Sequence, residues 1–161
     1  MNRPARPSLL RALLLGSLLL GTACNRDQPV RAATPHASPA ASASVGGAVL
    51  QASPVALADL NPSVASQYGI AAGQQGVLLL VTVRDPAGNA IDPGDLQLDA
   101  RAAVLPEPAR PLALRPIRTN GLTDYIGVVD ATPPASVQFS LVATRNGARA
   151  DIATTAELYP R

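Results

Sequence analysis

The sequence has few of the residues that most often carry chemistry in a protein site. In 161 residues it has one cysteine, one histidine, no tryptophan and no lysine. A single cysteine excludes a disulfide within the chain, and we expect the one histidine, His36, to lie outside the folded domain. A Ser-His-Asp triad, a Cys-His pair and a zinc site built from His and Cys are therefore excluded for that domain.

Charge is scarce and nearly balanced. Thirteen arginines and eleven acidic residues give the chain a net charge of +2. Arg3, Arg6 and Arg11 stand in the N-terminal leader, and without them ten basic groups face eleven acidic ones, a net charge of −1. The remaining chain has no basic run, so it lacks the electrostatic footprint that nucleic-acid binding requires.

Residues 1–23 have the pattern of a bacterial secretory signal. A basic start is followed by an apolar stretch over residues 12–20 and then by small residues. The stretch is shorter than the roughly 20 apolar residues of a permanent membrane span. Leu20 to Cys24 (LGTAC) resemble a lipobox, the site that lipoprotein signal peptidase cuts before a cysteine. The alternative is a free cysteine beside an ordinary cleavage site.

The lipobox resemblance implies a lipoprotein anchored through Cys24. Lipoproteins of this kind carry three acyl chains, and several buried chains hold a protein firmly in a bilayer. Asn25 follows the cysteine where an aspartate would signal retention in the inner membrane. We therefore expect the protein in the cell envelope, on the outer membrane and facing the periplasm.

Residues 24–44 are rich in Ala, Ser and Pro and have no apolar periodicity. Such a segment cannot bury enough surface to offset the entropy of ordering it, so we expect a disordered tether. His36 lies in this segment without neighbouring ligands, and we assign it no metal site.

Residues 45–161 are predicted to form one β-domain with an aliphatic core. Short runs rich in Val, Leu, Ile and Thr alternate with turn signals, as strands do. The predicted strands cover residues 48–52, 77–84, 96–104, 112–117, 123–129, 136–143 and 149–158. About seven strands favour an immunoglobulin-like antiparallel β-sandwich, with a barrel as the alternative. The run at 77–83 is nearly all apolar and is expected to lie centrally, whereas Pro116 indicates an edge strand.

The turns and the one predicted helix have explicit signals. Residues 85–89 (DPAGN) and 92–95 (DPGD) combine Pro with Gly or Asn, and residues 145–148 (RNGA) contain the Asn-Gly pair of tight hairpins. Asn61 as N-cap, Pro62 at the first helical position and Gly69 as a stop predict two helical turns over residues 61–68. Val64 and Tyr68 are expected to pack on the sheet.

Five stretches resemble domain of unknown function family 4426, a family of Gram-negative periplasmic proteins. They are residues 60–70 (LNPSVASQYGI), 77–83 (VLLLVTV), 112–117 (LALRPI), 125–127 (YIG) and 156–159 (AELY). The chain departs from the pattern at Pro116, where an acidic residue is expected, and at Asp124, where a tyrosine is expected. The resemblance implies a compact periplasmic β-domain and no assigned activity.

Other chemical sites have weak support in the sequence. Asp92, Asp95 and Asp99 could offer oxygen ligands to calcium, but their spacing matches no compact calcium loop, and turn geometry explains them better. No glycine-rich loop is placed to hold phosphates, and aromatics are too few for a sugar cleft. We expect no cofactor, no metal and no enzymatic activity.

The best candidate binding surface in the sequence is the turn near residue 120. Arg115, Arg118, Asn120 and Tyr125 cluster around it, and Arg and Tyr are frequent in interface hot spots. The alternative is an ordinary solvent-exposed edge hairpin. We expect a non-enzymatic module that binds an envelope protein or has a structural role. The second hypothesis is a binding module for a small apolar ligand, which would need a pocket inside the sandwich.

Overall fold

The computed structural model describes residues 40–160. The predicted signal, the lipidation residue Cys24 and His36 lie outside the described residues. Between residues 40 and 160 there is no helix with the length and hydropathy needed to cross a membrane.

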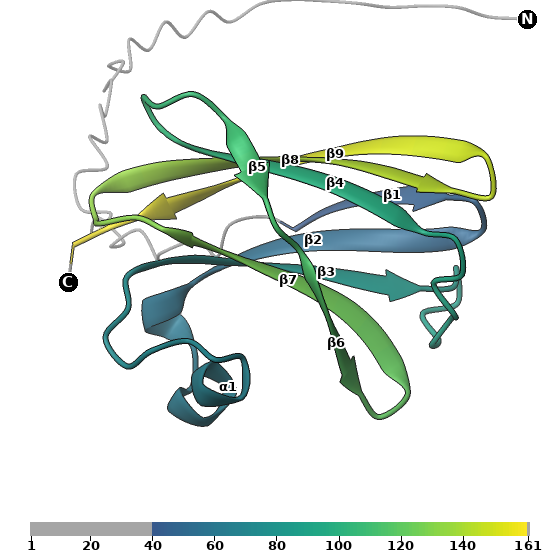
Figure 1. The fold of residues 1–161 in the computed structure, drawn as a ribbon, viewed down its shortest axis with the longest axis horizontal. Coiled ribbons are helices and arrows are strands. Elements are labelled where there is room, and N and C mark those ends of the chain that lie inside the picture. Colours follow the sequence, from purple (N-terminus) through teal and green to yellow (C-terminus); the bar gives the residue numbers. More distant parts are fainter. Residues whose placement is uncertain (1–39, 161) are drawn as a thin grey trace, which may run out of the picture. The chain divides into compact units, whose positions relative to one another are not determined.

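The described residues fold into a sandwich of two antiparallel sheets (Figure 1). The first sheet has the strand order β1 (Ala41–Val45), β2 (Ala48–Ala56), β3 (Gly76–Arg84), β7 (Leu122–Asp130), β6 (Arg115–Thr119). The second has the order β5 (Arg110–Leu112), β4 (Gln97–Val104), β8 (Ala135–Arg145), β9 (Ala148–Leu158). The predicted β-sandwich is confirmed, with nine strands in residues 40–160 in place of about seven.

The core lies between the two sheets because the inward-facing positions of their long strands are mostly apolar. Inward-facing residues of β2, β3, β8 and β9 are almost completely buried, and the largest of them is Phe139. The outward-facing residues of β8 and β9 are mostly polar and exposed, as for a sheet with one wet face. β3 occupies the centre of its sheet, as its apolar run predicted.

β3 is buried on its second face as well, by the segment between β2 and β3. This segment contains η1 (Leu57–Asp59) and α1 (Pro62–Gln67), which Figure 1 shows on the side of the sheet away from β8 and β9. Leu57 and Ile70 from the segment form a second small core with Leu78 and Ile126 of the sheet. The covering segment explains why β3 reads as apolar throughout.

The predicted helix is confirmed with its capping residues. Asn61 Oδ1 accepts a hydrogen bond from the Ser63 amide at 2.9 Å, and Pro62 is the first helical residue. Gly69 follows at a φ of +66°. Tyr68 packs on the second core as expected, but Ala65 joins it there and Val64 does not.

Two boundaries differ from the prediction. Residues 41–44, placed in the tether, belong to β1, which forms a hairpin with β2 across Gly46 and Gly47. Alanine and serine alternate in β1, and the small alanines pack against the core, so a polar composition concealed a strand. The predicted strand at 112–117 is two strands, because β5 pairs with β4 in one sheet and β6 with β7 in the other.

At residues 113 and 114 the chain crosses from the second sheet to the first. This crossing segment lies directly over Gly127 of β7. A Cβ atom on Gly127 would lie 2.9 Å from Leu114 Cδ2, 3.0 Å from Leu112 Cγ and 3.1 Å from the Ala113 carbonyl oxygen. Glycine therefore suits the close approach of the crossing segment, because a larger residue would force Leu112, Leu114 or the Ala113 carbonyl to shift. Two of the motifs that carry the family resemblance, 112–117 and 125–127, meet at this point.

We predict that Gly127→Ala lowers the free energy of unfolding by about 1–3 kcal/mol, the usual cost of overpacking a core. Gly127→Val should cost more, because it adds further atoms against the Ala113 carbonyl. Urea denaturation of the parent and both variants measures the effect, and an alanine variant as stable as the parent would contradict the crossing geometry.

Candidate functional site

The four residues of the predicted binding surface do not share one face. Arg115 and Arg118 lie three residues apart on edge strand β6, so their side chains leave opposite faces of the sheet. Tyr125 is opposite Pro116 and packs half-buried against the main core. Asn120 forms the β6–β7 turn with Gly121 at φ angles of +50° and +79°. The residues are close in sequence, but strand alternation separates them in space.

Arg115 has a structural contact that the sequence did not indicate. Its guanidinium donates a hydrogen bond to the Tyr68 carbonyl oxygen at the end of α1. Ile117, two residues further on the same face, packs on the second core. Arg115 therefore ties the covering helix to the edge of the sheet.

Asp124, one of the departures from the family pattern, forms an ion pair with Arg84 of neighbouring strand β3. The Arg84 Nη1 and Nη2 atoms lie 2.6 and 3.2 Å from the two carboxylate oxygens, so the pair is bidentate. The side chains are only 21% and 14% exposed. Such a desolvated, two-bond pair fixes β3 against β7, which gives Asp124 a structural role.

The aspartates considered for calcium are turn and surface residues. Asp92 Oδ1 accepts from the Gly94 amide at 3.0 Å, and Asp95 accepts from the Asn146 amide at 3.0 Å. Asp99 is exposed on β4. In the part of the chain that the structure describes, no three His, Cys, Asp or Glu side chains gather to hold a metal ion.

Arg145 lies at the end of the sandwich that contains the β8–β9 turn. It connects this turn to the β1–β2 turn and to the loop between β3 and β4. It donates to the Pro93 carbonyl at 3.0 Å, to the Asp92 carbonyl at 3.1 Å and to the Gly46 carbonyl. The Asn146 amide side chain also donates to Gly46, at 3.0 Å. The predicted Asn-Gly hairpin is present, with Asn146 and Gly147 at φ angles of +49° and +73°. These bonds make this end of the domain a connected structural cluster.

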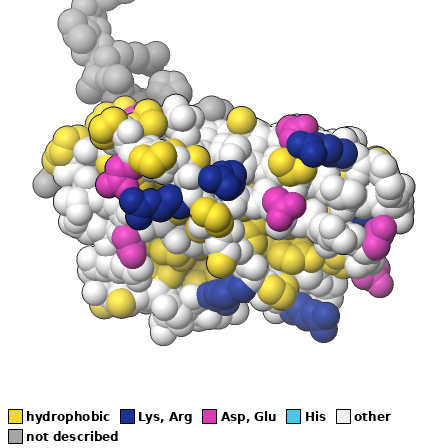
Figure 2. All heavy atoms as spheres, turned by 45° about the horizontal axis from the view of Figure 1, so that its top comes forward, with side chains coloured by type: hydrophobic (Ala, Val, Ile, Leu, Met, Phe, Trp, Pro, Cys, Tyr) yellow, Lys and Arg dark blue, Asp and Glu magenta, His cyan; other side chains and the backbone are white. Residues whose placement is uncertain are grey.

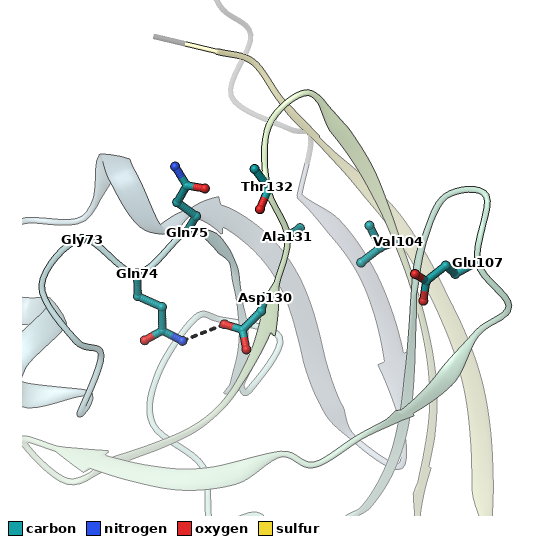
Figure 3. A pocket seen from close by; sticks show the side chains of 8 residues that line it. All are labelled: Gly73, Gln74, Gln75, Val104, Glu107, Asp130, Ala131 and Thr132. Carbon is teal, nitrogen blue, oxygen red and sulfur yellow. Dashed lines mark hydrogen bonds between the residues drawn. The ribbon is translucent and has the colours of Figure 1, made fainter.

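The opposite end has an open groove of about 610 Å³, shown in Figure 3. It is lined by the residues just before β3 and by residues at or just after the ends of β4 and β7: Gly73, Gln74, Gln75, Val104, Glu107, Asp130, Ala131 and Thr132. Gln74 Nε2 donates to Asp130 Oδ1 at 2.8 Å, and the Ala131 amide donates to the Gln75 carbonyl at 3.4 Å. Glu107 stands on the other side of the groove. The lining offers hydrogen-bonding groups of both kinds and carboxylates from two directions.

Two large apolar side chains are exposed at the same end of the domain as this groove. Leu105 is 44% exposed and follows Val104 of the lining, and Tyr159 is 68% exposed just beyond β9. The Leu105 amide donates to the Ser136 carbonyl at 2.9 Å, and Leu158 pairs with Ala135, so both lie near the start of β8. Figure 2 shows hydrophobic side chains near one end of the domain and in a band along the middle of the visible face, with charged side chains between them.

Sequence reasoning missed the groove, because its walls come from three loops that only the fold brings together. The sequence held only a weak signal for this end of the domain. Leu105 and Tyr159 each precede a proline and each lie just beyond a predicted strand.

Comparison with known families identifies the domain. The family described as Domain of unknown function (DUF4426) matches residues 45–161. The chain belongs to this family. The resemblance inferred from five short motifs is therefore confirmed. In this chain the match begins at Val45, the last residue of β1. A comparison with curated proteins found no match.

One solved structure supports the fold of this DUF4426 domain. A DUF4426 family protein from Pseudomonas aeruginosa PAO1 aligns with a TM-score of 0.57 at 14% identity, over 78% of this chain and 97% of that one. FetP of uropathogenic Escherichia coli strain F11, expressed in the periplasm, aligns with a TM-score of 0.48 at 11% identity, over 76% and 96% of the two chains. The first comparison shows the fold alone, and the second is too distant to carry an argument.

The loop after β3 gives a prediction about pKa. Asp85 accepts hydrogen bonds from the Asn89 side-chain amide at 3.0 Å and from the Asn89 and Ala87 backbone amides at 2.8 and 2.9 Å. These bonds, the Asn89 side chain first, hold the pKa of Asp85 below its usual value. The stabilisation that follows is present above the unfolded-state pKa and is lost as the pH falls through the lowered one.

We predict that Asn89→Ala moves the pKa of Asp85 back towards its usual value, but not completely, because the backbone amides still donate. An NMR titration of the Asp85 carboxyl carbon in both proteins measures this. An unchanged pKa in the variant would show that the Asn89 amide does not stabilise the carboxylate.

Proposed function

We propose that this protein is a non-enzymatic envelope lipoprotein whose β-sandwich binds another envelope protein through the groove end of the domain. The observation that carries the proposal is the contrast between a filled interior and an exposed apolar surface at one end. Leu105 and Tyr159 are exposed at the same end as a polar groove, and exposed apolar side chains bordered by polar residues mark protein–protein interaction sites.

The filled interior counts against the second hypothesis, a carrier of a small apolar ligand. Such a carrier needs an enclosed apolar cavity of several hundred cubic ångströms. Between the sheets the side chains of β2, β3 and β8 are packed to almost complete burial. The 610 Å³ groove and a second hollow of about 390 Å³ near Phe139 are open to solvent. Apolar ligands would gain little shelter in either.

The location is part of the proposal and rests on the sequence. A secretory leader, the lipobox ending at Cys24 and Asn25 in place of aspartate support an outer-membrane anchor facing the periplasm. The described domain begins at residue 40, so the chain between Cys24 and Ala41 separates it from the anchor. A tether keeps a small domain near the membrane, where even weak affinity for a neighbouring protein suffices.

We predict that the native protein carries a diacylglycerol and a third acyl chain on Cys24. Intact mass should show these additions on a chain that starts at Cys24, and the protein should fractionate with the outer membrane. Cys24→Ala should lose both the added mass and the membrane association. An unmodified chain in the soluble periplasm would contradict the lipoprotein proposal but not the protein-binding proposal.

We predict that a photo-crosslinking amino acid at Tyr159 or at Glu107 captures one defined envelope protein in intact cells. The same probe at Asp99, exposed on the outer face of β4, is the matched control and should capture nothing specific. The double variant Leu105→Ser, Tyr159→Ser should reduce capture from Glu107 more than ten-fold, because each buried apolar side chain contributes roughly 1.5–3 kcal/mol. Equal capture at Asp99 would argue against a binding role for the groove end.

A further inference from the structure

One sheet edge of the domain differs from the other three. β5 has three residues and contains Pro111, β6 has five and contains Pro116, and β1 has five. Short strands and prolines are devices that prevent an edge from pairing with another chain. β9 has eleven residues, pairs without interruption to β8 from Ala148 to Leu158, and contains neither proline nor glycine. In the described residues, β9 alone presents a long, regular edge.

The β8–β9 hairpin determines which backbone groups β9 presents. Its two-residue turn, Asn146-Gly147, is closed by the pair Arg145–Ala148, and such a closing pair is hydrogen-bonded in both directions. Even-numbered residues of β9 therefore direct their amide and carbonyl groups to β8. The odd-numbered residues direct theirs away from the sheet: Arg149, Asp151, Ala153, Thr155 and Glu157.

The side chains of these five residues lie on the solvent face of the second sheet. Arg149 and Asp151 form an exposed ion pair at 3.0 Å, with 65% and 68% of their side chains accessible. Ala153 and Glu157 are also exposed, and Thr155 is partly so. The edge thus carries a positive charge at one end, negative charges on either side of its centre, and a small residue in the middle.

We propose that β9 pairs with β9 of a second copy of this chain, antiparallel and centred on Ala153. This register brings Arg149 opposite Glu157 of the second copy, twice by symmetry, and Asp151 opposite Thr155. Ala153 faces its own mate on the two-fold axis. Each of the five facing pairs exchanges two backbone hydrogen bonds, about ten in all. The two second sheets then become one continuous sheet.

Charge selects this register over its neighbours. Centring the pair on Asp151 sets two aspartates against each other, and centring it on Thr154 sets Asp151 against Glu157. Like charges directly opposite each other in a sheet are destabilising. Centring on Ile152 removes both ion pairs and leaves Glu157 opposite the turn. The Ala153 register alone uses all five residues and opposes no like charges.

The pairing is distinct from the proposed function, because it uses the edge of β9 and not the groove. In this register Tyr159, just beyond β9, lies opposite Gly147 of the second copy, whereas Leu105 and Glu107 follow β4, two strands away from the edge. Because the paired strands are antiparallel, the two grooves lie at opposite ends of the dimer.

A cysteine at the axis tests the register. In the full chain with Cys24→Ala, which removes the native thiol, Ala153→Cys should form a disulfide-linked dimer under oxidising conditions. Thr155→Cys is the matched control. In this register residue 155 faces residue 151 of the second copy, so the two cysteines at position 155 would lie about 13 Å apart along the strands, too far for a disulfide. Crosslinking of both variants alike, or of neither, would overturn the proposed register.

Charge reversal tests the same pairing without a covalent bond. Arg149→Glu and Glu157→Arg should each raise the dissociation constant of the dimer roughly ten-fold, since two favourable pairs become repulsive. The double variant Arg149→Glu, Glu157→Arg should restore the parent value. Sedimentation of the full chain with Cys24→Ala measures this, and thermal unfolding checks that each variant is folded. A parent protein that stays monomeric at high micromolar concentration, or a double variant that fails to recover, would overturn the proposal.

Discussion

The passage of the chain over Gly127 is the constraint on which the rest of this structure depends. It moves the polypeptide from β5 in one sheet to β6 in the other within two residues, and a Cβ atom on Gly127 would fit only if its neighbours shifted. The crossing closes one side of the sandwich with a covalent connection. It also sets β6 beside β7, where Arg115 can reach the end of α1 and Ile117 can complete the second core.

The two ends of the sandwich are built for different purposes. At one end Arg145, Asn146 and Asp95 join the turns of two hairpins and the β3–β4 connection through hydrogen bonds. At the other end the loops meet through few bonds and leave a polar groove with two exposed apolar side chains. This contrast between a connected end and an open end supports the binding surface proposed for the groove end.

Much of the fold could be predicted because the relevant signals are local. Strand alternation predicted the sandwich, Asn146-Gly147 its last hairpin, and Asn61 with Pro62 the start of the helix. The prediction was wrong for two segments. The Ala/Ser sequence of residues 41–44 has the composition of a tether, but in the fold it is part of strand β1, whose small alanines pack against the core. The run 112–117 has the pattern of one strand, and nothing local reveals that its two halves belong to different sheets.

The sequence by itself determined the class of fold, the turn chemistry and the absence of thiol and imidazole chemistry from the domain, because these depend on residue type and short-range spacing. It also carries the whole case for the anchor at Cys24. Only the tertiary structure decided that Arg115 and Arg118 lie on opposite faces, that Asp124 pairs with Arg84, and that three loops form one groove. These features depend on contacts between residues far apart in the chain, and sheet pairing and the crossing at Gly127 fix those contacts.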